Sequence, residues 1–185
     1  STGEPLEHGQ IYESNSYSIA SLVSELGHTP IRVPAVSDSI EQLRTNLDLA
    51  ASAADVIITS GGVSMGDWDL VRKLMEDEGD LKFWRVKLRP GSPPIFGLWN
   101  GTPLFGLPGN PVSGHCVFYT IVRPWMKFIT GAVGPSDRIV KVRLLEDLKA
   151  VKDCLTMRRI KIEHTPDGLV ATQPTHQGPG TLPSL

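Results

Sequence analysis

The pattern of apolar and polar positions along the chain predicts four helices, at residues 17–26, 40–54, 67–78 and 112–129. Signals for the start of a helix precede three of them: Asn15-Ser16, Asp38 with Glu41 at capping-box spacing, and Asn110 before Pro111. These signals indicate where the chain enters each helix.

Between the helices lie short apolar runs that predict β-strands, at residues 29–33, 55–59, 81–86, 94–97 and 102–106. The run at 55–59 contains Val-Ile-Ile without polar alternation, which is typical of a central strand in a parallel sheet. Because strands and helices alternate along the chain, we predict an α/β fold in three layers, with a parallel sheet covered by helices on both faces.

The pattern changes near residue 135. Beyond it, Val140, Val142 and Leu144 alternate with charged residues, as do Ile160 and Ile162, and Gly/Pro turns separate the runs. Such alternation is typical of half-buried strands. We therefore predict a first domain over residues 1–135 and a small all-β C-terminal domain over residues 136–185.

The composition of the chain argues against several classes of protein. The 185 residues have a net charge of −2, which argues against a general nucleic-acid binder. No apolar run approaches the roughly 18–20 residues of a membrane span, and no signal-peptide pattern opens the chain. Cys116 and Cys154 lack a Cys-x-x-Cys partner, so we expect no disulfide or zinc site and a cytoplasmic location. Cys116 lies in an apolar helical stretch, where buried packing is its expected role.

A glycine-rich turn, Ser60-Gly-Gly-Val-Ser-Met-Gly66, joins the strand at 55–59 to the next helix. A helix start presents free N–H groups, and glycines let the backbone approach a ligand, so such a turn binds phosphate well. Asp67 and Asp69 follow at the helix start. They either cap the helix or hold Mg²⁺ against the phosphate. A tight turn without a ligand is the remaining alternative.

A second loop, Gly106-Leu-Pro-Gly-Asn-Pro-Val-Ser113, also joins a strand to a helix. Its two prolines make it stiff, so little conformational entropy is lost on binding. Asn110, Ser113 and His115 are candidates for polar contacts, although a lone histidine is more often packed or solvated. A rigid helix cap without a ligand is the alternative.

A basic stretch lies between the two turns. On a strand, Arg85, Lys87 and Arg89 would point to one face. This face either reaches a doubly charged oxyanion or is simply solvated.

Three long motifs, Ser60–Asp69, Phe83–Pro93 and Gly106–Ser113, resemble the molybdopterin molybdenumtransferase family, which also forms the C-terminal part of gephyrin in animals. The motifs Gly9–Asn15 and Gln177–Gly180 match it as well. The resemblance implies a molybdopterin-binding α/β domain followed by a small β domain. It also implies an enzyme of molybdenum cofactor biosynthesis that takes adenylated molybdopterin and molybdate, hydrolyses the adenylate in a Mg²⁺-dependent reaction and inserts molybdenum.

The resemblance also implies roles for individual residues. Gly61, Gly62, Ser64 and Gly66 would bind the pterin phosphate. Asp67 and Asp69 would lie near the metal and the pyrophosphate. Of the two, Asp69 is the first candidate for orienting the attacking water. The second loop would complete the cofactor site with five residues: Pro108, Gly109, Asn110, Pro111 and Ser113. Arg89 and Ser113 are the candidates for molybdate.

Three departures from the family pattern qualify this expectation. Ser92 stands where the family usually has a lysine, and Glu4-Pro5 stands where it has Asp-Glu. Full-length members also carry domains and a first core strand before this point, so we expect a fragment. The family forms dimers that share active sites, so we expect a homodimer, with contact to the molybdopterin adenylyltransferase as a further partner.

Three other functions compete with this enzyme. They are a pterin-binding module without turnover, an adenylyltransferase-type domain of the same fold, and a gephyrin-like receptor scaffold. The small β domain, the second glycine-rich loop and the late Gln177–Gly180 motif favour the molybdenum-inserting enzyme over the adenylyltransferase. Nothing in the sequence specifically supports scaffolding.

Overall fold

The computed structural model describes residues 12–36, 39–63, 69–132 and 139–174. Its helices are α1 (Asn15–Glu25), α2 (Ile40–Ala53), α3 (Leu70–Asp77), α4 (Pro111–Val117) and α5 (Arg123–Thr130), with a π-helical segment, Phe118–Val122, between the last two. Its strands are β1 (Ile57–Ser60), β2 (Asp80–Trp84), β3 (Leu88–Arg89), β4 (Ile95–Trp99), β5 (Thr102–Leu107), β6 (Arg143–Leu144), β7 (Leu155–Thr156), β8 (Lys161–Thr165) and β9 (Gly168–Thr172). None of the helices in these ranges is long and apolar enough to cross a membrane.

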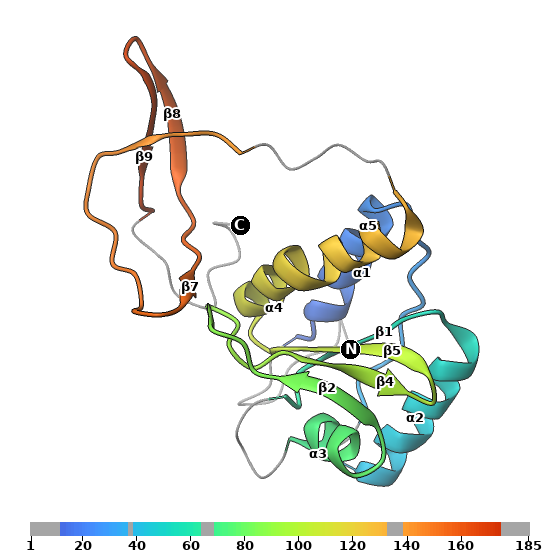
Figure 1. The fold of residues 1–185 in the computed structure, drawn as a ribbon. Helices are drawn as coiled ribbons and strands as arrows, with labels where there is room; N and C mark the ends of the chain where they lie inside the picture. Colours follow the sequence, from blue (N-terminus) through green and yellow to red (C-terminus); the bar gives the residue numbers. More distant parts are fainter. Residues whose placement is uncertain (1–11, 37–38, 64–68, 133–138, 175–185) are drawn as a thin grey trace.

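The predicted three layers are confirmed. A four-stranded sheet in the order β1-β5-β4-β2 lies between α1, α4 and α5 on one face and α2 and α3 on the other (Figure 1). Each face has its own hydrophobic core. Phe105 on β5 packs in the first core and Leu104 in the second, at 2% and 0% exposure. Burial of both faces explains why these strands are continuously apolar.

The predicted parallel sheet is wrong for one of its four strands. β1 and β5 are parallel, but β4 is antiparallel to both β5 and β2. The reason is local: Asn100-Gly101 joins β4 to β5, and its φ values of 48° and 82° are both positive. An Asn-Gly pair with two positive φ angles is typical of a type I′ hairpin turn, which forces its strands to be antiparallel.

Helix starts differ from the sequence prediction by small amounts. Asn15 is the first residue of α1 rather than its cap, and Glu13 accepts hydrogen bonds from the backbone N–H and the hydroxyl of Ser16. Ser39 caps α2, while Asp38 lies outside the described residues. Residues 29–33, predicted as a strand, form no regular element. The fourth predicted helix is present, with Asn110 as its cap and Pro111 as its first residue.

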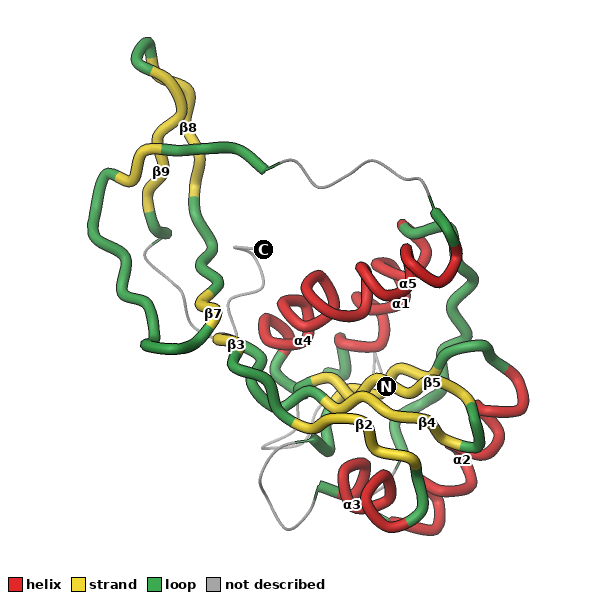
Figure 2. The backbone as a smooth tube through the Cα atoms, in the orientation of Figure 1, coloured by secondary structure: helices red, strands yellow, loops and turns green. Residues whose placement is uncertain are grey.

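The C-terminal part contains a three-stranded sheet in the order β6-β9-β8, in which β8 and β9 form a hairpin. Figure 2 shows the short strands β3 and β7 side by side where this part meets the rest of the chain. Backbone N–H groups of Leu155 and Met157 donate to the carbonyls of Lys87 and Arg89, at 2.8 and 2.7 Å. The C-terminal part is thus hydrogen-bonded directly to the basic stretch.

Candidate functional site

All three motifs begin where β1, β5 and β2 end, on the same side of the main sheet. We call this line of strand ends the glycine-rich edge. The parallel register places Ser60 at the end of β1 beside Leu107 at the end of β5. β4 runs antiparallel to β5, and β2 runs antiparallel to β4. The start of β4 therefore lies beside the ends of its neighbours, and Ile95 pairs with both Gly106 and Trp84. The two glycine-rich turns and the basic stretch that follows Trp84 therefore leave the sheet at the same edge. Ligands bind at this kind of edge in open α/β sheets.

The first turn is shaped by two glycines with positive φ. Gly61 and Gly62 have φ values of 90° and 68°. A Cβ on Gly62 would lie 3.0 Å from a methyl group of Val71, in the first turn of α3. The backbone of the turn therefore lies against the start of the helix. Ser64, Gly66 and Asp67, also candidates for the site, lie outside the described residues.

The second loop is a rigid helix start. The Asn110 side chain accepts a hydrogen bond from the N–H of Ser113 at 3.2 Å. Pro108 is buried, Pro111 and Ser113 are half-buried, and Gly109 is exposed. His115 has its Nδ1 2.9 Å from the carbonyl oxygen of Pro111, one helical turn earlier. The exposed Gly109 is thus the part of the loop most open to a ligand.

The two turns touch each other directly. The N–H of Gly61 donates to the carbonyl of Leu107 at 2.9 Å, and a Cβ on Gly109 would lie 3.4 Å from the Cα of Gly61. The side-chain amide of Asn15 bridges them, because it donates to the Ser60 hydroxyl and to the Gly109 carbonyl, each at 2.8 Å. The two glycine-rich turns form one continuous backbone surface.

Asp69 is the residue immediately before α3, and its side chain makes no capping hydrogen bond to the first turn of that helix. A carboxylate at this end of a helix is stabilised by the helix dipole. Among the residues that the structure describes, no three His, Cys, Asp or Glu side chains are grouped to hold a metal ion. The described part of the site therefore offers one carboxylate, Asp69, to a cation.

The basic residues are brought together, although not in the predicted way. β2 ends at Trp84, and Arg85 has a φ of 70°, so Arg85, Lys87 and Arg89 do not share one face of a single strand. They line instead a shallow cavity of about 350 Å³ between the core and the C-terminal part. The other residues that line it are Val86, Ser92, Val151, Lys152, Asp153 and Cys154. Four cationic side chains and one carboxylate give this basic pocket a positive potential that suits an anion.

Ser113, the second candidate for molybdate, does not line the basic pocket. The segment after Arg89 nevertheless packs against it, since a Cβ on the buried Gly91 would lie 3.2 Å from the Ser113 carbonyl oxygen. The basic stretch therefore connects the pocket to the start of α4.

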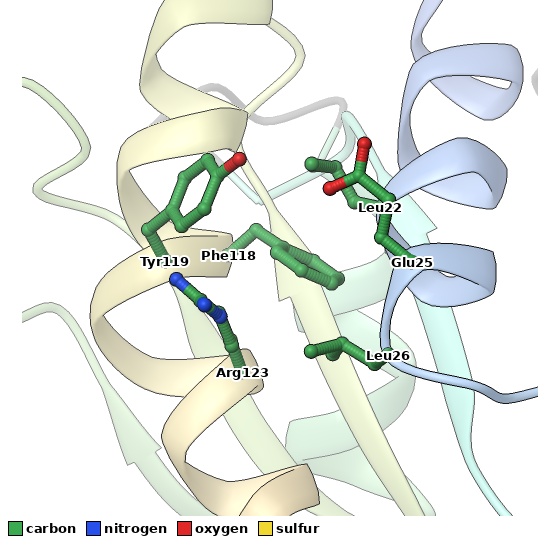
Figure 3. Close-up of a pocket in the computed structure, with 6 residues that line it drawn as sticks. All are labelled: Leu22, Glu25, Leu26, Phe118, Tyr119 and Arg123. Carbon is green, nitrogen blue, oxygen red and sulfur yellow. The ribbon is translucent and has the colours of Figure 1, made fainter. Parts of the chain in front are cut away.

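A second, smaller cavity lies between α1 and the π-helical segment (Figure 3). Leu22, Leu26 and Phe118 point into it, with Arg123 and Tyr119 side by side on the opposite helix. It starts about two helical turns beyond Asn15, so it is separate from the glycine-rich edge.

Sequence reasoning missed two members of the site. Asn15 was interpreted as a helix cap, and its partners lie 45 and 94 residues away. Lys152 lies in the C-terminal part and reaches the basic pocket only because β7 pairs with β3. No local pattern contains either contact. Cys116, expected to be buried, is half-buried, and burial raises the pKa of its thiol.

Comparison with known proteins identifies relatives of this chain. The molybdopterin molybdenumtransferase of Haemophilus influenzae is 36% identical over 129 residues, which cover 70% of this chain and 32% of that enzyme. Molybdopterin molybdenumtransferase 2 of Mycobacterium tuberculosis is 34% identical over 180 residues, which cover 94% of this chain and 44% of the enzyme. The chain thus spans less than half the length of these curated relatives.

Two solved structures have a similar fold over most of this chain. The molybdopterin biosynthesis MoeA protein from Pyrococcus horikosii matches with a TM-score of 0.64 and 33% identity, over 72% of this chain and 33% of that one. A molybdenum cofactor biosynthesis protein from Pyrococcus furiosus matches with a TM-score of 0.67 over 93% of this chain and 54% of that one. At 20% identity, this second likeness shows the fold alone. Residues 1–127 match the family described as a probable molybdopterin binding domain, and this chain belongs to that family.

Proposed function

We propose that this chain carries the substrate site of a molybdopterin molybdenumtransferase, which inserts molybdate into adenylated molybdopterin. One observation carries the proposal: two glycine-rich turns meet at one sheet edge, in a chain whose relatives bear that enzyme's name. Hydrolysis of the adenylate consumes one water molecule, breaks the bond between the two phosphoryl groups and releases AMP.

The first turn is proposed to bind the phosphate of the pterin. Gly61 and Gly62 lie next to the start of α3, where the helix dipole favours an anion. Ser64 and Gly66 belong to the same proposed site by sequence. The second loop lies against the first, so one ligand can contact both. Its proposed contacts come from Pro108, Gly109, Asn110, Pro111 and Ser113.

Asp69 and Asp67 are proposed to hold Mg²⁺ and to orient the attacking water, with Asp69 as the first choice. The donor set fits this ion, because Mg²⁺ is usually held by one or two carboxylates together with substrate phosphates and water. Bound magnesium would neutralise charge that develops on the departing phosphate. The helix starts at Asp69 and Asn110 act on the same charge with fixed dipoles and need no reorganisation.

Molybdate, the second substrate, is proposed to bind at the basic pocket. Arg89 lines that pocket with Arg85, Lys87 and Lys152. A doubly charged oxyanion is attracted by several cations at once, and guanidinium groups present paired donors to two oxygens. Ser113, at the start of α4, is the other proposed contact, and its backbone carbonyl lies near the segment that follows Arg89.

Four further properties complete the proposal. Residues 136–185 form a separate small β domain, and the whole protein is a cytoplasmic homodimer. Contact with the molybdopterin adenylyltransferase would deliver the adenylated substrate directly. The domain follows from the change of sequence pattern near residue 135, and the location from the absence of a Cys-x-x-Cys pair. The homodimer and the partner contact follow from the family resemblance.

Calorimetric titration with adenylated molybdopterin, with and without Mg²⁺, tests the function when AMP release is followed in the same sample. We expect binding and Mg²⁺-dependent release of AMP. Asp69→Asn should abolish release and spare binding, whereas Asp77→Asn, at the far end of α3, should preserve both.

Two other results would change the conclusion. Binding without AMP release would make the chain a pterin-binding module, in keeping with its span of less than half of the relatives. A chain that does not bind adenylated molybdopterin would contradict the proposed function.

A further inference from the structure

Asn15 joins three elements of the site through one side chain. It is the first residue of α1, and its amide nitrogen lies 2.8 Å from the Ser60 hydroxyl oxygen and 2.8 Å from the Gly109 carbonyl oxygen. A carbonyl oxygen only accepts hydrogen bonds, so the amide must turn its NH₂ group toward Gly109. Both hydrogens of this group are then used, one for each glycine-rich turn.

The helix that carries Asn15 is held in place independently of these bonds. Leu22 and Val23 of α1 are 7% and 8% exposed and pack in the same core as Phe118 and Phe105. Arg32 also holds the start of α1, since its guanidinium donates to the Ser16 hydroxyl and lies over the Tyr17 ring. Asn15 therefore reaches the two turns from a fixed support.

We infer that Asn15 is a positioning residue that holds the two glycine-rich turns at the separation a single substrate needs. This inference rests on the proposed function, because it concerns the same site. Gly61 and Gly109 meet through backbone atoms alone, with no side chains to interlock. Without the Asn15 bridge, the described parts of the two turns are still joined by the hydrogen bond from the Gly61 N–H to the Leu107 carbonyl. Two loops that are fixed before the ligand arrives lose less conformational entropy on binding.

The test compares Asn15→Ala and Asn15→Leu with a matched control. Leucine keeps the bulk of asparagine but donates no hydrogen bond. Asn46→Ala is the control, because Asn46 is also half-buried and donates at 2.8 Å to Gln42, but on α2. Two quantities are measured for each variant: affinity for adenylated molybdopterin by calorimetry, and the free energy of unfolding by urea denaturation.

We expect both Asn15 variants to remain folded and to bind about tenfold more weakly, because the ligand must then order two turns that Asn15 fixes in the parent chain. The Asn46 variant should bind as the parent chain does. A merely structural role would lower the free energy of unfolding and leave the affinity of the folded protein unchanged, which would overturn the inference. Full affinity in Asn15→Leu would also overturn it, since bulk would then suffice.

Failure of the proposed function has a different signature. If the parent chain itself does not bind adenylated molybdopterin, the proposed function is wrong and a role for Asn15 in binding that substrate falls with it. If the parent chain binds and the Asn15 variants bind equally well, only the inference about Asn15 is wrong.

Discussion

A Cβ on Gly109 would lie 3.4 Å from the Cα of Gly61, so two residues 48 positions apart touch through their backbones. The glycine-rich turns after β1 and β5 are consequently one structural unit, braced by Asn15. This contact gives different expectations for the two glycines.

Gly61→Ala should destabilise the fold, and Gly109→Ala should not. Gly61 has a φ of 90°, and a side chain in the left-handed region costs about 1–2 kcal/mol. At Gly109 the distance of 3.4 Å is an ordinary van der Waals contact, and φ is not positive. We expect a change within about 0.5 kcal/mol there. Urea denaturation measures both, and equal losses would contradict this account of the turn.

The Asn110 cap should contribute measurably to stability. Its side chain accepts from the Ser113 N–H at 3.2 Å, and this bond satisfies one of the free donors at the start of α4. Replacement of a capping asparagine by alanine typically costs about 1 kcal/mol, so Asn110→Ala should lower the free energy of unfolding by about that amount. Asn110→Ser, which keeps a capping oxygen, should recover most of the loss. If alanine and serine are equivalent, the cap is not the stabilising feature.

How much of this architecture was predictable depends on whether a signal is local. The pair Asn110-Pro111 determines its own helix start, and the apolar run at β1 determines its own strand, so both were predicted correctly. Strand direction was predicted wrongly for β4, which alone runs against β1, β5 and β2 in the main sheet. That prediction rests on the alternation of helices and strands and does not use the local signal, Asn100-Gly101, which specifies a hairpin turn.

The site was predictable only where its residues lie within the motifs. The glycines of the two turns were identified from their positions after apolar strands. The bridge from Asn15 to Gly109 and the approach of Lys152 to Arg89 depend on how distant segments pack. A sequence pattern shows the order of residues along the chain. It does not directly indicate contacts between distant segments.

Oxyanion binding at the basic pocket should depend on Lys152 as well as on Arg89. These exposed cations line one cavity, and each exposed charge contributes up to about 1 kcal/mol, or roughly fivefold in affinity. We expect Lys152→Ala and Arg89→Ala each to weaken molybdate binding several-fold by calorimetry, with a smaller effect at high salt. Lys161→Ala is the control, because that ammonium pairs with Glu163 on β8. Unchanged affinity in both pocket variants would rule out molybdate binding there.

The ion pair between Arg44 and Glu78 should make stability depend on pH. Two hydrogen bonds, at 2.5 and 2.7 Å, join α2 to the end of α3, and the hydrogen bond from Arg44 lowers the pKa of the Glu78 carboxyl below its ordinary 4.5. A lowered pKa contributes stability above the unfolded value, and this contribution is lost as the pH falls through the folded value. Both side chains are more than a third exposed, so we expect a small effect.

Glu78→Gln isolates this effect. The variant should be slightly less stable than the parent chain near neutral pH, and the difference should disappear as the pH falls below about 4.5. Urea denaturation at a series of pH values measures it. A difference that persists at the lowest pH would show that packing of residue 78, rather than its charge, matters.

The most direct test of the central claim is a titration of the ¹⁵N-labelled chain with adenylated molybdopterin and Mg²⁺, followed by backbone amide chemical shifts. If the glycine-rich edge is the substrate site, the amides of Gly61, Gly62 and Gly109 will shift together with a common dissociation constant. Leu22 and Tyr119, at the separate cavity in Figure 3, will not respond. Shifts confined to that cavity, or none at the two turns, would contradict the account.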